Sequence, residues 1–274
     1  METLGYFLAA LVGISLGLIG GGGSILTVPI LVYVMGINPI LATSYSLFIV
    51  GSTSMVGALN NYRKGFVEIK TALLFGISSI STVFLTRKFI VPAIPKQILK
   101  AGNFVLTEAV LTMLLFALLM LAASIAMIKN GKEKEGANPN NLIIRKKINL
   151  PKLLLYGIAI GFATGLLGAG GGFLLIPTLV LLVGMPMKEA VGTSLLIIAL
   201  NSLIGFTGDI GHFKIDWLFL VKITAIAIAG IFIGGSLSKK IDGAKLKKAF
   251  GWFVLAMGIY IIIKEVFFTS ITHH

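Results

Sequence analysis

Gly13-Ile-Ser-Leu-Gly-Leu-Ile-Gly-Gly-Gly-Gly-Ser-Ile-Leu-Thr-Val-Pro29 is one of two stretches that decide the fold of this chain. The other is Gly161-Phe-Ala-Thr-Gly-Leu-Leu-Gly-Ala-Gly-Gly-Gly-Phe-Leu-Leu-Ile-Pro177. Each interrupts an apolar run with glycines. Glycine weakens a helix, and lipid offers no partner to an exposed backbone polar group. We therefore expect both tracts to face protein or a water-filled cavity, and we interpret them as halves of one site.

The composition is that of a membrane protein. The 274 residues are 57% hydrophobic and 12% charged, with a mean hydropathy of +1.00, whereas soluble domains average about 25% charged residues. Several apolar windows have about the 20 residues that a helix needs to cross the hydrocarbon core. The sequence therefore predicts an all-α, polytopic integral membrane protein, with the lipid bilayer of the cytoplasmic membrane as its surroundings.

The net charge of +13 follows the membrane topology. Lysine and arginine gather in the short connections between apolar segments, which is the positive-inside pattern. No basic patch with interleaved aromatic residues occurs on a separate soluble domain, so we do not expect a nucleic acid as partner. The chain has no cysteine, which excludes disulfides and thiolate metal sites.

An internal repeat organises the chain. With a shift of 148 positions, seven glycines and prolines coincide, at 13, 17, 20, 22, 23, 29 and 36 in the first half. Glu68 also falls on Asp216, and Thr43-Ser44 matches Thr193-Ser194 if two residues are inserted in the second half. We therefore divide the chain into a first transmembrane repeat at 1–128, a polar cytoplasmic linker at 129–151 and a second repeat at 152–274.

Each repeat is expected to contain a glycine-broken segment, at about 4–35 and 152–183, followed by three helices. Those helices are expected at about 40–59, 70–90 and 104–128, with counterparts at 189–207, 217–237 and 248–268. As one helix, residues 4–35 would run about 48 Å, which is too long for one crossing without strong tilt. A re-entrant hairpin resolves the length, and long tilted broken helices are the alternative.

Charge counting favours the hairpin. With re-entrant first segments, 16 of the 23 lysines and arginines lie on the linker face, against 13 if those segments cross fully. Each half then has three crossings, so the halves are inverted relative to each other, a plan common among secondary transporters.

The tracts predict an anion site. A helix that restarts at Ser24 has free N–H groups, a hydroxyl available as N-cap and the positive end of its dipole. A restart near Gly172 brings a second helix end to the same depth. Such a site needs no cation deep inside it. The expected substrate-binding residues are Gly21, Gly22, Gly23, Ser24, Thr43, Ser44, Gly170, Gly171, Gly172, Thr193, Ser194 and Asn201.

Further polar residues accompany these segments. The helices after each tract carry further polar residues, Thr53, Ser54 and Ser202. Their hydroxyls either donate to an oxyanion or form hydrogen bonds with carbonyl groups of their own helix. Asp209, His212 and Glu108 are the candidates for proton coupling, because histidine titrates near neutral pH and an acid inside an apolar helix is a functional candidate. For Asp209 and His212, an interfacial pair without a role in transport is the alternative.

The chain resembles the sulfite exporter TauE/SafE family over nearly its whole length. The features that carry the resemblance are the glycine tracts, Pro29, the Thr-Ser pairs and the repetition after a charged linker. The resemblance includes the stretches from Asn60 to Glu68 and from Gly208 to Asp216. It implies a permease for a small sulfur-containing anion such as sulfite, sulfoacetate, thiosulfate or another organosulfonate.

From this we expect a secondary transporter with alternating access, coupled to H⁺ or Na⁺ because no nucleotide-binding domain is present. A passive small-anion channel is the alternative. We do not expect an enzyme, a cofactor or a metal, because no nucleophile with its base and no metal-ligand cluster occurs at apolar depth. The sequence leaves the oligomeric state open.

Overall fold

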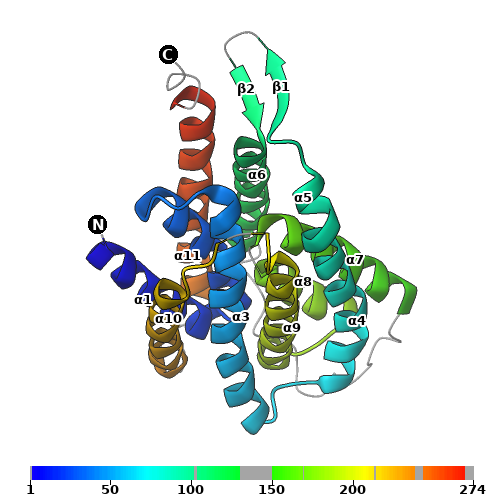
Figure 1. Cartoon of the computed structure of the whole chain (residues 1–274). Helices are drawn as coiled ribbons and strands as arrows, with labels where there is room; N and C mark the ends of the chain where they lie inside the picture. Colours follow the sequence, from blue (N-terminus) through cyan, green and yellow to red (C-terminus); the bar gives the residue numbers. More distant parts are fainter. Residues whose placement is uncertain are drawn as a thin grey trace.

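The computed structural model describes residues 2–101, 104–129, 150–168, 170–212, 214–237 and 243–268. These residues form a helical bundle from which one short β-hairpin projects (Figure 1). Most of the predicted linker, residues 130–149, lies outside the described residues.

The first half contains helices α1 to α6 and the hairpin. Their bounds, with the 3₁₀ turn η1 and the π turns η2 and η3, are α1 Glu2–Ile19, η1 Gly21–Leu26, α2 Thr27–Pro29, η2 Ile30–Val34, α3 Pro39–Arg63, α4 Ile69–Leu85, η3 Thr86–Ile90, α5 Val91–Ala93, β1 Gln97–Ala101, β2 Phe104–Thr107 and α6 Glu108–Lys129. The second half repeats the helical part. Its elements are α7 Leu150–Leu167, α8 Gly172–Thr178, the π turn η5 Leu179–Val183, α9 Met187–Asp209, α10 Trp217–Leu237, α11 Gly243–Ile263 and the π turn η6 Lys264–Phe268.

Six helical stretches among the described residues are long and apolar enough to cross a membrane. They are Pro39–Arg63, Ile69–Ala93, Glu108–Ile125, Leu150–Leu167, Met187–Asp209 and Trp217–Leu237. The second of these joins α4, η3 and α5 into one span. The predicted all-α, polytopic membrane class is confirmed.

The β-hairpin differs from the expected helix at 104–128, which begins instead at Glu108. Strands β1 and β2 pair antiparallel, and the Phe104-Val-Leu-Thr107 run of β2 is rich in the aromatic and β-branched residues that favour strands. The hairpin lies at the end of the bundle opposite the α3–α4 connection (Figure 1).

Both glycine-broken segments turn back on themselves. A Cβ placed on Gly5 in α1 would lie 2.5 Å from the Met35 Cε, so the end of the first segment returns to its beginning. In the second segment, Leu153 near the start and Val183 near the end belong to one buried cluster. The chain reverses at glycines with positive φ, 75° at Gly20 and 68° at Gly171. Each segment is therefore a hairpin with its tip at a glycine tract.

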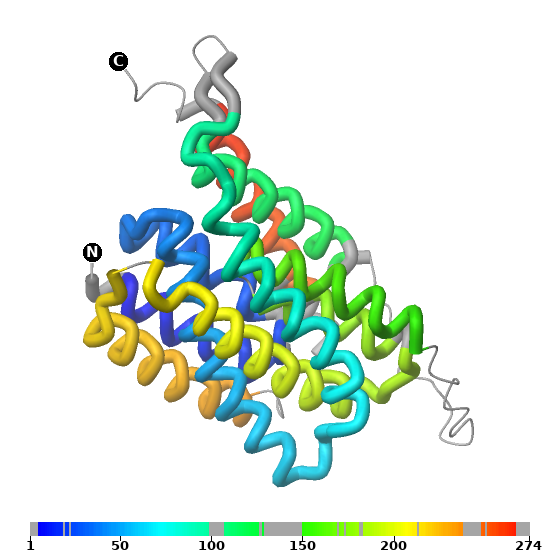
Figure 2. Tube along the Cα trace, turned by 45° about the vertical axis from the view of Figure 1, so that its right-hand side comes forward, coloured from blue at the N-terminus to red at the C-terminus, as the bar shows by residue number. Residues whose placement is uncertain are grey.

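The two halves pack against each other through matching helix pairs. Helix α1 packs on α10 and α7 on α4, while α3 pairs with α9, α6 with α11 and the tip η1 with α8. Helices α3 and α9 run in opposite directions in both views, as do α4 and α10 (Figures 1 and 2).

Glycines bring paired helices into backbone contact. A Cβ on Gly13 would lie 2.0 Å from the Ala227 carbonyl oxygen, and one on Gly161 would lie 2.5 Å from the Ser79 carbonyl oxygen. Gly161 lies 148 positions after Gly13, and Ala227 lies 148 positions after Ser79, so the two contacts are equivalent in the repeat. Small residues allow this approach in lipid, where helices associate by close packing.

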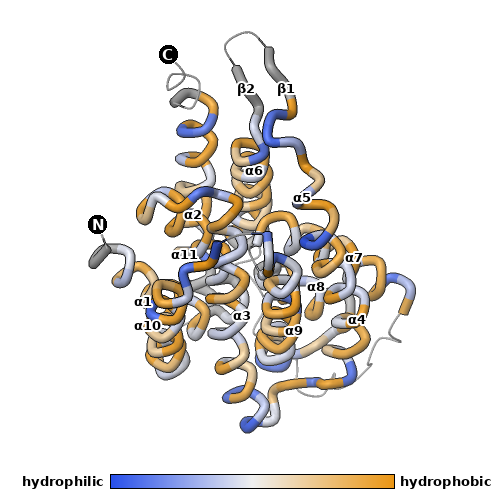
Figure 3. The backbone as a smooth tube through the Cα atoms, in the orientation of Figure 1, coloured by the Kyte–Doolittle hydropathy of each residue, from blue (hydrophilic) through white to orange (hydrophobic). Residues whose placement is uncertain are grey.

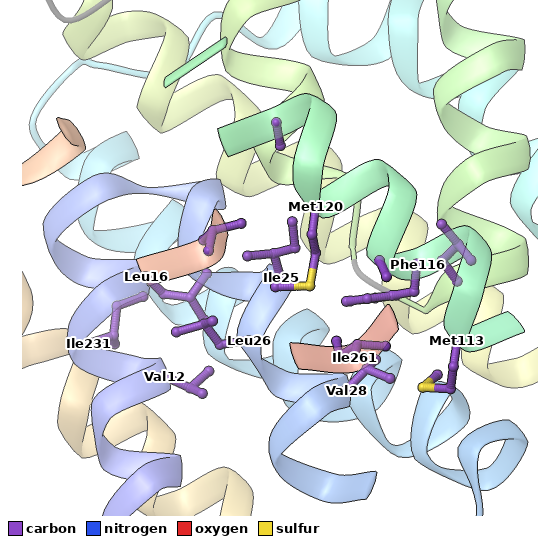
Figure 4. Packing of buried hydrophobic residues seen from close by; sticks show 14 residues of the cluster. Val12, Leu16, Ile25, Leu26, Val28, Met113, Phe116, Met120, Ile231 and Ile261 are labelled. Carbon is purple, nitrogen blue, oxygen red and sulfur yellow. The ribbon is translucent and has the colours of Figure 1, made fainter. Parts of the chain in front are cut away.

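One large apolar cluster joins both halves. Leu16 and Ile25 of the first hairpin pack with Met120 of α6, Ile231 of α10 and Ile261 of α11 (Figure 4). Helices α6 and α11 pack on each other, and their residues in this cluster pack on Ile25 of η1, so the cluster supports the first glycine tip from one side.

Apolar residues predominate along the helices (Figure 3), and many of them are exposed on the outside of the bundle, where lipid is the solvent. Ile77, Leu118 and Leu218 are each more than 60% exposed. Hydrophilic residues gather at the ends of helices, for example at the α3–α4 connection (Figure 3).

We predict that two adjacent glycines of α10 differ sharply in their tolerance of a methyl group. A Cβ on Gly234 would lie 2.1 Å from the Ile14 carbonyl oxygen, whereas a Cβ on Gly235 has no neighbour within 4 Å. Gly234→Ala should lower the free energy of unfolding by about 1–3 kcal/mol through overpacking. Gly235→Ala, the matched control, should leave it unchanged or raise it by up to about 1 kcal/mol, because alanine is the better helix former. Chemical denaturation in detergent micelles measures both, and equal effects would contradict the α1–α10 packing.

Candidate functional site

The two glycine tips touch each other at the centre of the bundle. A Cβ on Gly21 would lie 2.5 Å from the Gly172 Cα, and a Cβ on Gly172 would lie 2.3 Å from the Gly21 carbonyl oxygen. Any larger residue at either position would push the two backbones apart. The structure therefore brings together the two tracts that the sequence predicts as one site.

The other tract residues are held by neighbouring helices. A Cβ on Gly170 would contact Val50 of α3 and Ile198 and Ser202 of α9, while Gly171 and Gly23 pack on α7 and α1 of their own hairpins. Gly22 lies within η1. Gly170 of the second tract thus packs against both α3 and α9.

Ser24 does not cap a restarting helix. The 3₁₀ turn begins at Gly21 after Gly20, without a side-chain cap. The Ser24 hydroxyl instead donates to the Gly21 carbonyl oxygen at 2.8 Å. The expected N-cap role is wrong because the tight 3₁₀ turn places the hydroxyl next to a carbonyl three residues back.

Fully buried polar oxygens line the α3–α9 crossing. The Asn201 amide nitrogen donates to the Ser79 hydroxyl at 2.6 Å. Its carbonyl oxygen and the hydroxyls of Thr53, Ser54 and Ser202 have no hydrogen-bond partner among the described residues. Buried polar groups are almost always paired, with protein, water or a ligand. This set therefore marks a position where water or a ligand is expected.

The two Thr-Ser pairs lie in the expected helices, α3 and α9, but they do not match each other in the repeat. The Thr193 hydroxyl accepts the Glu68 N–H at 2.9 Å, and the Tyr45 hydroxyl accepts the Asp216 N–H at 2.8 Å. Thr193 lies 148 positions after Tyr45, and Asp216 lies 148 positions after Glu68. Thr193 therefore corresponds to Tyr45, and the repeat needs no insertion here. The predicted match of Thr43-Ser44 with Thr193-Ser194 is wrong, because a residue of different size makes the same contact in each half.

Thr43 and Ser44 lie instead beside a buried ion pair. Arg87 in the π turn η3 is fully buried, and its Nη1 lies 3.1 Å from Asp209 Oδ2 at the end of α9. The same Nη1 donates to the Thr43 hydroxyl at 3.1 Å. Ser44 lies next to the Asp209 carboxylate.

The ion pair borders the second glycine tract. A Cβ on Gly168 would lie 2.3 Å from the Thr43 carbonyl oxygen, so the tract packs directly on the residue that accepts from Arg87. A cation is therefore buried next to the predicted site, where none was expected. The signal that could have revealed it is a single arginine inside the apolar run 70–90, since an ionisable residue within a membrane span is a functional candidate.

The three candidates for proton coupling do not form one cluster in the described contacts. Asp209 is held by Arg87. His212 is exposed in the turn that follows, where its N–H donates to the Asp209 carbonyl oxygen. Glu108 begins α6 next to the hairpin, where its N–H donates to the Lys96 carbonyl oxygen. Among the described residues no group of three His, Cys, Asp or Glu side chains lies close enough to hold a metal ion.

The structure is that of a helical membrane protein with an enclosed polar site. Its membrane-length helices, its paired glycine hairpins and its buried polar centre define this class. A profile of the sulfite exporter TauE/SafE family matches residues 6–261. The chain belongs to this family.

Relatives of this chain are described as transporters. It is 31% identical over 255 residues to a probable membrane transporter protein of Xylella fastidiosa strain 9a5c, covering 92% of this chain and 91% of that protein. It is 27% identical over 241 residues to the probable membrane transporter protein YdhB of Bacillus subtilis, with 87% and 91% coverage. No solved structure matches the chain. The chain is thus a membrane transporter and not an enzyme.

We predict that the ion pair behaves as a unit in stability measurements. Asp209→Leu leaves the buried Arg87 without a counter-charge and should lower the free energy of unfolding by about 3–5 kcal/mol. The double variant Arg87→Met/Asp209→Leu should recover most of that loss, because replacing both partners by apolar residues is often neutral. Denaturation of the purified variants in detergent gives the coupling energy. Additive losses in the double variant would contradict the pairing.

Proposed function

We propose that this transporter moves a small sulfur-containing anion across the cytoplasmic membrane as a secondary transporter. Sulfite, sulfoacetate, thiosulfate and other organosulfonates are the substrate class. Membership of the TauE/SafE family supports this class, because its description names sulfite export.

The observation that carries the proposal is the contact between the Gly21 and Gly172 backbones, near buried hydroxyls that have no hydrogen-bond partner in the described part of the chain. Backbone N–H groups and hydroxyls are neutral donors, which suit an oxyanion that must be bound and then released. The binding set we propose consists of Gly21, Gly22, Gly23, Ser24, Thr43, Ser44, Gly170, Gly171, Gly172, Thr193, Ser194 and Asn201.

Alternating access follows from an inverted repeat. We propose that the two halves are related by a pseudo-two-fold axis in the membrane plane. The opposite directions of α3 and α9 and of α4 and α10 support this (Figure 2), as do the matched contacts of Gly13 and Gly161. In transporters with inverted repeats, substrate sites lie at the repeat interface and one bundle rocks against the other.

Coupling to H⁺ or Na⁺ supplies the energy in this proposal, with Asp209, His212 and Glu108 as the groups for a proton. Asp209 is the member of this set next to the glycine tract, through Arg87 and Thr43. Transport driven by a pH step, measured with and without a Na⁺ gradient, separates the two ions.

We predict saturable counterflow. Liposomes that contain the purified protein and unlabelled sulfite should accumulate ³⁵S-sulfite transiently above equilibrium, because a carrier returns loaded faster than empty. Thiosulfate and sulfoacetate loaded inside report the range of substrates, and protein-free liposomes are the control. A linear, unsaturable flux with single-channel currents would instead identify a passive anion channel.

A further inference from the structure

The guanidinium of Arg87 uses only one of its three nitrogens in hydrogen bonds to the described residues. Its Nη1 is bonded to Asp209 Oδ2 and to the Thr43 hydroxyl, each at 3.1 Å. Its Nε and Nη2 have no acceptor among the described residues, although the side chain is fully buried. Two buried donors of a charged group without acceptors are costly, so a ligand or water that supplies acceptors is expected there.

The edge of the guanidinium that carries Nε and Nη2 has the shape of an oxyanion receptor. The Nε–H and one Nη2–H of a guanidinium point in the same direction in a rigid plane, at the spacing of two oxygens of one sulfonate, sulfite or carboxylate group. Lysine cannot reproduce this fork, because its ammonium is a point charge.

The surroundings hold the arginine in position next to the tract. A Cβ on Gly208 of α9 would lie 3.1 Å from the Arg87 Cβ, so a glycine makes room for the side chain. Thr43, which accepts from Nη1, packs against Gly168 at the start of the second tract. Asp209 balances the charge of Arg87, so an anion would be bound by directed hydrogen bonds without a large excess of positive charge.

The pair also breaks the symmetry of the two halves. The position 148 residues after Arg87 is Gly235, and the position 148 residues before Asp209 is Asn61. A substrate with one charged end, such as an organosulfonate, would therefore have its charged end at the Arg87 side of the centre.

We propose that Arg87 is an anion-binding residue of this transporter, whose Nε and Nη2 groups donate to two oxygens of the sulfur oxyanion while Nη1 stays on Asp209 and Thr43. This assignment rests on the proposed function and adds a cation to the set of neutral donors.

Binding to purified protein in detergent tests the proposal, with sulfite, thiosulfate and sulfoacetate as probes in isothermal titration. Arg87→Lys keeps the positive charge beside Asp209 and loses the fork, so the Kd should rise by about 10- to 100-fold, as expected for lost hydrogen bonds to a charged group. Lys88→Gln removes the neighbouring cation of the same π turn, which is exposed over the Phe84 and Phe89 rings. Its Kd should stay within about twofold of the wild type, because the Lys88 side chain is exposed on the outside of the bundle whereas the Arg87 guanidinium is fully buried.

The double variant Arg87→Met/Asp209→Leu separates binding from folding. It should unfold at about the temperature of the wild type and bind none of the three anions. Wild-type affinity in both this variant and Arg87→Lys would overturn the assignment of Arg87 and leave the proposed function standing. If the wild type itself binds none of the probes and shows no counterflow, the proposed function and the assignment are both wrong.

Discussion

The whole bundle depends on backbone-to-backbone packing at glycine. Water does not drive helices together inside a bilayer, so association relies on close van der Waals contact and interhelical hydrogen bonds. Gly13 and Gly161 provide that contact at the two outer helix pairs, and Gly21 and Gly172 provide it where the two hairpin tips meet. The same residues that hold the fold together therefore leave main chain, without side chains, at its centre.

A centre built from backbone offers only amide N–H and carbonyl groups, and α3 and α9 supply the polar side chains around it. Thr53, Ser54 and Ser202 are buried without partners among the described residues, and they come from the two helices that pair across the halves. Arg87 and Asp209 are added on one side only. A near-symmetric frame suits rocking between two states, whereas a one-sided charge pair suits a ligand with two unlike ends.

The sequence was sufficient for the features that depend on local pattern. The glycine tracts and the shift of 148 positions follow from composition and periodicity, and five of the six predicted helices coincide with stretches of membrane length. The sixth such stretch among the described residues is Leu150–Leu167, which lies in a segment predicted as a re-entrant hairpin, and the predicted helix at 248–268 is not one of the six. Contacts between distant segments were not predictable in the same way. Tyr45 and Thr193 make one kind of contact with unlike side chains, which hid the register. Arg87 counted as one more interfacial charge because its partner Asp209 lies 122 positions away.

In the proposed alternating-access cycle, the meeting point of the glycine tips opens to each side of the membrane in turn. Ser202 lies beside Gly170 at this point, and the chain has no cysteine of its own. In Ser202→Cys, a membrane-impermeant maleimide should label the new thiol from either side of sealed vesicles, and sulfoacetate should slow both reactions. A variant that still performs counterflow but reacts from neither side would contradict the account.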